Sequence, residues 1–141
     1  MRFKAAALRP LHWVKNLLVL APLFFSGNIA QADLAARELL ALAGFCMAAS
    51  HIYIVNDLAD VAADRGNLPR STRPYASGAL GRRDMVVLAV VTAAAAAGVA
   101  TALGGGYMLA VLGYAAVMHI YTFFLKKRDI AGIAVISAGM L

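Results

Sequence analysis

Long apolar runs, separated by short charged segments, dominate this sequence of 141 residues and restrict what it can fold into. Hydrophobic residues make up 62% of the chain, whereas an ordinary soluble domain contains about 45–50% apolar residues. A helix needs about 20 consecutive apolar residues to cross the hydrocarbon core of a bilayer. Because one soluble core cannot account for several such runs, the sequence predicts an all-α membrane protein. We expect a multi-pass bundle of transmembrane helices surrounded by membrane lipids.

The apolar runs predict four spans and the start of a fifth. They are expected at Leu17–Ile29, Leu39–Leu58, Met85–Leu103, Tyr107–Leu125 and from Ile130 onward. The last run reaches Leu141 after about twelve residues, which is too short to span a bilayer, so we expect the sequence to be truncated there. The run Ala93–Ala97 indicates close helix packing, and the triplet Gly104–Gly106 indicates a tight turn.

The basic residues are distributed unevenly between the two ends of the expected spans. Of the 13 Lys and Arg residues, all except Arg37 fall in the N-terminal segment, the second connection or the fourth connection. The positive-inside rule then places the N-terminus and the second connection in the cytoplasm, and the cell inner membrane is the expected location. This topology, with contact to anionic lipid, explains the net charge of +6 without a nucleic-acid partner.

A polar face interrupts the apolar pattern where the second span ends. If the helix continues through Asp64, a rotation of about 100° per residue places four polar residues within an arc of roughly 100°. These residues are Asn56, Asp57, Asp60 and Asp64, with Tyr53 in the same arc. One charged side chain deep in lipid costs about 2.5–3.5 kcal/mol, so the carboxylates are expected to face water or a cavity with cations nearby. His51 points away from this face and is expected to be an interhelical or interfacial histidine.

The same residues suggest a metal and its ligand. Hard oxygen donors without histidine or cysteine favour Mg²⁺, which is usually completed by waters and substrate phosphates. We therefore expect Asp57, Asp60 and Asp64 to bind Mg²⁺. Asn56 is expected to orient these carboxylates or the diphosphate-bearing donor substrate. The following loop carries Arg70 and Arg73, and guanidinium groups bind phosphate through a planar fork of donors. Together these features predict a diphosphate clamp. The alternative that remains open is a solvated loop that only obeys the topology rule.

At these residues the sequence resembles the UbiA superfamily of membrane transferases. The segment 56–64 matches the first aspartate-rich motif of that family, while segments 9–19 and 73–78 resemble more particularly its decaprenyl-phosphate phosphoribosyltransferase branch. The resemblance covers nearly the whole chain. It implies a bundle of about nine helices around a cavity, with two aspartate-rich regions at its cytoplasmic mouth. Residues 1–141 would be the N-terminal part of a single transmembrane domain of this type.

Several residues are implied to bind substrate. They are Lys15, Asn16, Tyr53, Arg70, Arg73, Tyr121 and Lys126. Interfacial snorkelling explains Lys15 equally well. The chain departs from the family pattern at Arg70, where relatives often carry lysine, and at Asn67, where they often carry histidine. Gly132 stands where relatives usually carry an aspartate of the second region, and the nearest carboxylate is Asp129.

The resemblance implies a Mg²⁺-dependent transferase that uses a diphosphate-bearing donor. Because segment 13–16 resembles the phosphoribosyltransferase branch, the favoured reaction moves 5-phosphoribose from phosphoribosyl diphosphate to a polyprenyl phosphate. One alternative is a prenyltransferase that moves a polyprenyl group from its diphosphate to an aromatic acceptor, and the aspartate motif does not separate the two. A second alternative, suggested by Gly132, is a non-catalytic or degenerate membrane paralogue. The 141 residues alone are expected to be inactive.

The distribution of basic residues gives a prediction about topology. Cys46 is the single cysteine of the chain, so Cys46→Ala provides a background for single cysteines at Ser77 and Gly105. We expect a membrane-impermeant maleimide to label these two positions from opposite sides of the membrane, because they lie in consecutive connections. Labelling of both from the same side would contradict the predicted orientation.

Overall fold

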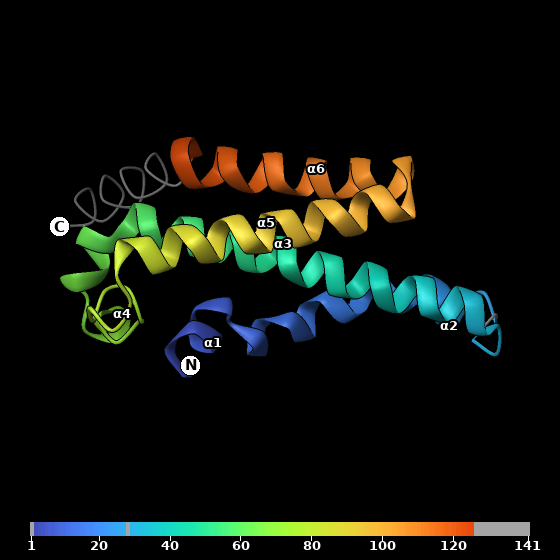
Figure 1. Cartoon of the computed structure of the whole chain (residues 1–141), viewed down its shortest axis with the longest axis horizontal. Helices are drawn as coiled ribbons and strands as arrows, with labels where there is room; N and C mark the ends of the chain where they lie inside the picture. The colour runs from blue at the N-terminus through green and yellow to red at the C-terminus, as the bar shows by residue number, and fades with distance from the viewer. Residues whose placement is uncertain (1, 28, 126–141) are drawn as a thin grey trace, which may run out of the picture.

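The computed structural model describes residues 2–27 and 29–125, and this part of the chain is built from helices without strands (Figure 1). In chain order the elements are α1 (Arg2–Leu8), the 3-10 helix η1 (Pro10–Leu20), α2 (Ala21–Phe25), α3 (Ala32–Arg65), α4 (Leu68–Ser71), α5 (Arg82–Leu103), α6 (Gly105–Ile120) and the π-helical turn η2 (Tyr121–Leu125). Helices α3, α5 and α6 pack against one another, and the N-terminal segment runs along α3 (Figure 1). The predicted all-α fold is confirmed.

Three helical stretches are long and apolar enough to cross a membrane. Within the described residues they are Ala32–Arg65, Arg82–Leu103 and Gly105–Phe124. These stretches contain the second and third predicted spans and nearly all of the fourth, so the chain is a multi-pass integral membrane protein. Helix α3 also continues through Asp64, as the shared polar face required. The span expected from Ile130 onward lies outside the described residues.

The first predicted span differs from the helix observed. We expected it at Leu17–Ile29, but the apolar helical stretch runs over Pro10–Phe25 and is shorter than the three candidate spans. Pro10 occupies the first helical position, where its fixed φ angle and missing N–H favour a helix start. Gly27 has a φ of +72°, a left-handed conformation that commonly ends helices. The backbone preferences of Pro10 and Gly27 therefore place both boundaries of this helix nearer the N-terminus than hydropathy predicts.

Small residues allow the long helices to approach closely. Ala48 of α3, Ala96 of α5 and Val111 of α6 form one buried cluster, so Ala96 is the member of the alanine run that packs between helices as expected. A second cluster, which includes Ile54 and Met85, joins α3 to the start of α5. Between α5 and α6 the chain turns at Gly104, whose φ of +97° and ψ of −177° suit glycine alone.

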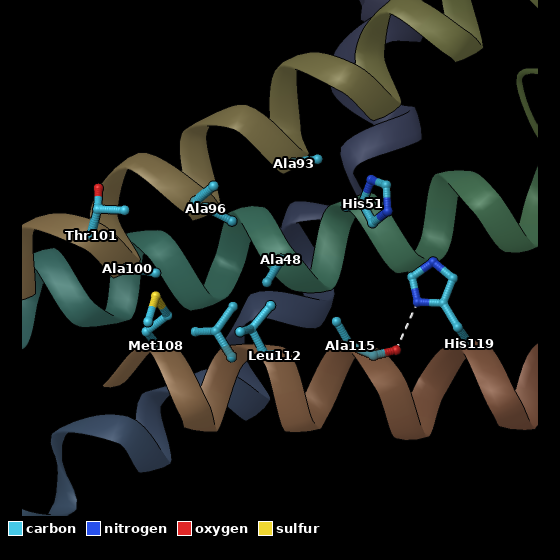
Figure 2. Close-up of a pocket in the computed structure, with 12 residues that line it drawn as sticks. Ala48, His51, Ala93, Ala96, Ala100, Thr101, Met108, Leu112, Ala115 and His119 are labelled. Carbon is cyan, nitrogen blue, oxygen red and sulfur yellow. Dashed lines mark hydrogen bonds between the residues drawn. The ribbon is translucent and has the colours of Figure 1, made fainter. Parts of the chain in front are cut away.

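A cavity of about 250 Å³ lies where α3, α5 and α6 meet. Figure 2 shows His51 from α3 and His119 from α6 close together at its wall, with alanines of α5 beside them. Their ring centroids are 5.5 Å apart. The Nδ1 atom of His51 lies 3.0 Å from the Ala89 carbonyl oxygen, and that of His119 lies 2.7 Å from the Ala115 carbonyl oxygen. Each Nδ1 is therefore the protonated nitrogen, since a carbonyl oxygen only accepts. His51 is the interhelical histidine that the sequence predicted.

The close approach of α3 and α5 can be tested at Gly44. A Cβ atom at this position would lie 2.6 Å from Val99 Cγ1 and 2.7 Å from the Tyr107 hydroxyl oxygen, which itself donates to the Ala41 carbonyl at 2.7 Å. We expect Gly44→Ala to lower the free energy of unfolding by about 1–3 kcal/mol through overpacking. Unfolding in mixed detergent micelles measures the change.

Gly98→Ala is the matched control for this prediction. Gly98 is also helical, but a Cβ atom there would meet nothing within 4 Å. Alanine should leave stability unchanged or raise it by about 0.5–1 kcal/mol, because it restricts the unfolded chain. Equal losses from the two substitutions would contradict the close contact at Gly44.

Candidate functional site

The aspartate-rich motif occupies the last turns of α3, where the helix extends beyond its apolar stretch. Asp57 and Asp64 are buried, with side chains only 3% and 1% exposed, whereas Asn56 and Asp60 are half-buried. Asp57 and Asp64 are about two helical turns apart and therefore share a face. The structure thus brings together two of the three predicted metal ligands on one buried surface.

Arg73 connects these two carboxylates. Its Nη1 atom donates to Asp57 Oδ1 at 3.1 Å and to Asp64 Oδ2 at 2.6 Å. The loop that carries Arg73 is held by backbone hydrogen bonds, among them Ser77 N to Arg73 O at 2.9 Å. Arg70 is more exposed, and its Nη1 lies 3.8 Å from Asp64 Oδ1. The cations that the carboxylates were expected to require are therefore supplied by the predicted loop.

Arg9 completes the cluster and was not among the predicted site residues. Its Nη2 atom donates to Asp57 Oδ1 at 2.5 Å, and its guanidinium lies 5.0 Å from the centroid of the Tyr53 ring. The sequence contained one signal for it, because Arg9 opens the N-terminal segment that resembles the family. Spacing along the chain gave no indication, since Arg9 and Asp57 are 48 positions apart.

Polar contacts fix the N-terminal segment along the same face of α3. Ser50 Oγ donates to the Leu8 carbonyl oxygen at 2.8 Å and accepts from Trp13 Nε1 at 3.0 Å. Farther along, Asn16 Nδ2 donates to Cys46 Sγ at 3.4 Å. The part of the polar face that holds Ser50 therefore packs against the N-terminal segment, and the carboxylates follow it toward the C-terminal end of α3.

Other predicted residues lie apart from the carboxylates. Lys15 is exposed and lines a surface groove with apolar residues, none of which belongs to the aspartate motif. Asn16 contacts Cys46, as described above, and Tyr121 is exposed in η2. Lys126 and Gly132 lie outside the described residues, as does Asp129. Of the predicted substrate-binding residues, Arg73 and Arg70 pair with the carboxylates themselves, and Tyr53 contacts the cluster through the Arg9 guanidinium.

The oxygen atoms of the motif fit a hard cation in part. Asn56 Oδ1 and Asp64 Oδ1 are buried and have no hydrogen-bond partner within the described structure, so both retain acceptor capacity. However, the described residues contain no group of three His, Cys, Asp or Glu that could hold an ion by itself. Mg²⁺ commonly takes one or two carboxylates and completes its shell with waters and substrate phosphates. The motif therefore fits Mg²⁺ as part of a coordination shell that other ligands complete.

Comparison with known proteins decides the family. The profile of the UbiA prenyltransferase family matches residues 18–141. The chain belongs to this family. Membership of the family confirms the resemblance carried by the aspartate motif. It also agrees with the three apolar helices and with the carboxylates at the end of α3.

Several curated proteins resemble this UbiA chain over nearly its whole length. It is 38% identical over 139 residues to the decaprenyl-phosphate phosphoribosyltransferase of Mycolicibacterium smegmatis, a match that covers 96% of the chain and 44% of the relative. The protein of the same name from Corynebacterium glutamicum is 38% identical over 141 residues, with coverage of 96% and 42%. The nodulation protein NoeC of Azorhizobium caulinodans is 34% identical over 132 residues, with coverage of 94% and 43%. The chain thus spans less than half the length of these relatives.

The ion pairs at the site predict unequal effects of two arginine substitutions. Arg73→Gln leaves Asp64 with Arg70 at 3.8 Å as its remaining ion-pair partner among the described residues. Removing one partner of a buried pair costs about 3–5 kcal/mol. Because the Arg73 side chain is 26% exposed, we expect a smaller loss of about 2–3 kcal/mol in the free energy of unfolding.

Arg70→Gln is the matched control, since it removes the same charge from the same loop. Its side chain is 49% exposed, so the expected loss is below about 1 kcal/mol. Both values follow from unfolding in mixed micelles. If Arg70→Gln proves as damaging as Arg73→Gln, Arg73 is not the principal counterion of the buried carboxylates.

Proposed function

We propose that residues 1–141 form the N-terminal part of a single UbiA-type transmembrane domain, and that the whole protein is a Mg²⁺-dependent transferase. The favoured reaction moves 5-phosphoribose from phosphoribosyl diphosphate to a polyprenyl phosphate, with diphosphate as the leaving group. The observation that carries this proposal is the buried cluster in which Asp57 and Asp64 are paired with Arg9 and Arg73.

The charges of the cluster favour a ligand that carries both signs. Its carboxylates suit a divalent cation, and its guanidinium groups suit phosphate oxygens. A diphosphate bound with Mg²⁺ presents both partners at once. A simple cation or a simple anion would instead leave one half of the cluster without a matching charge, which is unfavourable at a site shielded from water.

The proposed roles follow from these chemical preferences. Asp57, Asp60 and Asp64 would hold Mg²⁺, and Asn56, with its unsatisfied buried Oδ1, would orient them or the donor. Arg73 and Arg70 would bind the diphosphate. Bound Mg²⁺ would supply neutralisation of the negative charge on the leaving diphosphate. We assign Lys15 and Asn16 to the phosphate of the lipid acceptor, and Tyr121 and Lys126 to the approach to the second aspartate region.

The identity of the donor rests on the relatives rather than on the geometry. Two of the relatives described above carry the name decaprenyl-phosphate phosphoribosyltransferase, which favours phosphoribosyl diphosphate as the donor and a polyprenyl phosphate as the acceptor. Lys4 of the N-terminal segment pairs with Asp84 at the start of α5, and Arg9 of the same segment pairs with Asp57, so the N-terminal segment and the start of α5 lie at the same end of the bundle as the aspartates. With the positive-inside rule, this supports a cytoplasmic site in the cell inner membrane.

The proposal predicts that Asp60→Asn weakens binding of the donor and of Mg²⁺ together. Asp60 is half-buried, whereas Asp57 and Asp64 are buried, so its neutralisation should disturb the fold least. Loss of a charge-assisted contact is worth about 1.5–3 kcal/mol, so affinity should fall at least about tenfold. The measurement is binding and turnover of labelled phosphoribosyl diphosphate by the full-length protein in nanodiscs, with and without EDTA.

Asp33→Asn is the control for this experiment. Asp33 is an exposed carboxylate in the first turn of α3, at the opposite end of that helix, and its substitution should change neither binding nor turnover. Wild-type binding that is insensitive to EDTA, or an Asp60→Asn variant that binds like wild type, would contradict the proposed site. Turnover of a labelled polyprenyl diphosphate with an aromatic acceptor, but not of phosphoribosyl diphosphate, would instead favour a prenyltransferase.

A further inference from the structure

Arg9 occupies an unusual backbone position at the edge of the carboxylate cluster. With a φ of 53° and a ψ of 56°, it is the one non-glycine residue with a positive φ in the described part of the chain. This left-handed conformation is unfavourable for a residue with a side chain. It separates the end of α1 at Leu8 from the start of η1 at Pro10. The chain therefore bends at the residue that reaches Asp57.

Contacts on both sides of Arg9 hold this bend in place. The Leu8 carbonyl and the Trp13 indole are both hydrogen-bonded to Ser50 of α3. The guanidinium of Arg9 also lies over the Tyr53 ring at 5.0 Å, a geometry that stabilises a cation. The backbone and the ring together direct Arg9 toward Asp57, so its position is preorganised by the fold.

Within residues 2–27 and 29–125, the hydrogen bonds of Arg9 and Arg73 to the carboxylates use only part of their donor capacity. Both arginines donate to the same oxygen, Asp57 Oδ1, each through one nitrogen. A guanidinium group has five N–H donors in a planar fork, and neither arginine makes a two-nitrogen contact with Asp57. Each fork can therefore donate hydrogen bonds to phosphate oxygens. Asp57 is the carboxylate that pairs with both arginines.

We propose that Arg9 is a diphosphate-binding residue and that it exchanges partners with Asp57 when Mg²⁺ and diphosphate bind. In the described structure the guanidinium neutralises the carboxylate. On binding, the carboxylate turns to the metal ion and the guanidinium to the phosphate oxygens, so that no charge is left unpaired in a buried place. This inference rests on the proposed function, because it assumes that the cluster receives magnesium diphosphate. It also couples the N-terminal segment to occupancy of the site.

The exchange predicts opposite effects of one substitution on two ligands. In Arg9→Gln, Asp57 has lost a competing cation, so Mg²⁺ alone should bind roughly threefold to tenfold more tightly. Magnesium diphosphate should bind about tenfold more weakly, because a charge-assisted contact to phosphate is lost. Calorimetric titration of the full-length protein in nanodiscs with MgCl₂, and then with inorganic diphosphate at saturating Mg²⁺, measures both. A merely structural role of Arg9 would weaken both ligands or neither.

Lys4→Gln is the matched control, since it removes one positive charge from the same N-terminal segment. Lys4 pairs with Asp84 at 3.1 Å, and the two side chains are 56% and 43% exposed. Both affinities should remain at their wild-type values. If Arg9→Gln does not fold, Arg9→Lys keeps the charge beside Asp57 but lacks the fork. It should then bind Mg²⁺ alone as wild type does, and magnesium diphosphate several-fold more weakly.

Two different failures can be told apart. If wild type binds magnesium diphosphate and Asp60→Asn weakens it, the proposed function stands. In that case an Arg9→Gln variant that matches Lys4→Gln, or that changes both affinities in the same direction, overturns the exchange alone. If wild type does not bind magnesium diphosphate, the proposed function fails and the exchange fails with it.

Discussion

Two buried carboxylates at the end of a membrane-spanning helix impose the main constraint on this structure. Asp57 and Asp64 are almost fully shielded, and a carboxylate in such a place requires cations within hydrogen-bonding reach. Those cations come from Arg73 in the loop after α4 and from Arg9 at the bend before η1. Asp57 therefore helps to hold the N-terminal segment, and both carboxylates help to hold the loop.

Helix α3 has two faces, which contact different parts of the structure. One face carries Ser50, Tyr53 and the carboxylates, and it contacts the N-terminal segment. The other face packs against α5 and α6 through small residues, such as Gly44 and Ala48, and through His51. Lipid provides no hydrophobic driving force between helices, so close packing and interhelical hydrogen bonds hold this second face against α5 and α6. The polar face instead contacts the N-terminal segment and carries the site proposed for the ligand.

The charge arrangement links the fold to the proposed reaction. A cluster of paired acids and bases is neutral enough to be buried, and it still contains both kinds of partner that a metal diphosphate needs. Membership of the UbiA prenyltransferase family agrees with such a site at the end of a membrane helix. A site of this kind stabilises charge that develops on a leaving diphosphate with groups that are already in place, which reduces reorganisation during the reaction. In the proposed function, the same ion pairs that neutralise the aspartates also supply the groups that would meet the ligand.

Composition and periodicity by themselves determined the membrane helices, the polar face of α3 and the tight turn at Gly104, because these features depend on residues close together in the chain. The sequence also indicated that the loop with Arg70 and Arg73 supplies cations, but only the tertiary structure decided which arginine meets which carboxylate and that Arg9 joins them. Arg9 and Asp57 are 48 positions apart, and Arg73 and Asp57 are 16 apart, so their pairing depends on how helices and loops pack. The first helix also begins and ends nearer the N-terminus than predicted, because Pro10 and Gly27 set its ends where hydropathy alone indicated Leu17–Ile29. The periodicity of a helix determines which of its side chains share a face. Which other residues contact that face depends on how segments distant in the chain pack against it.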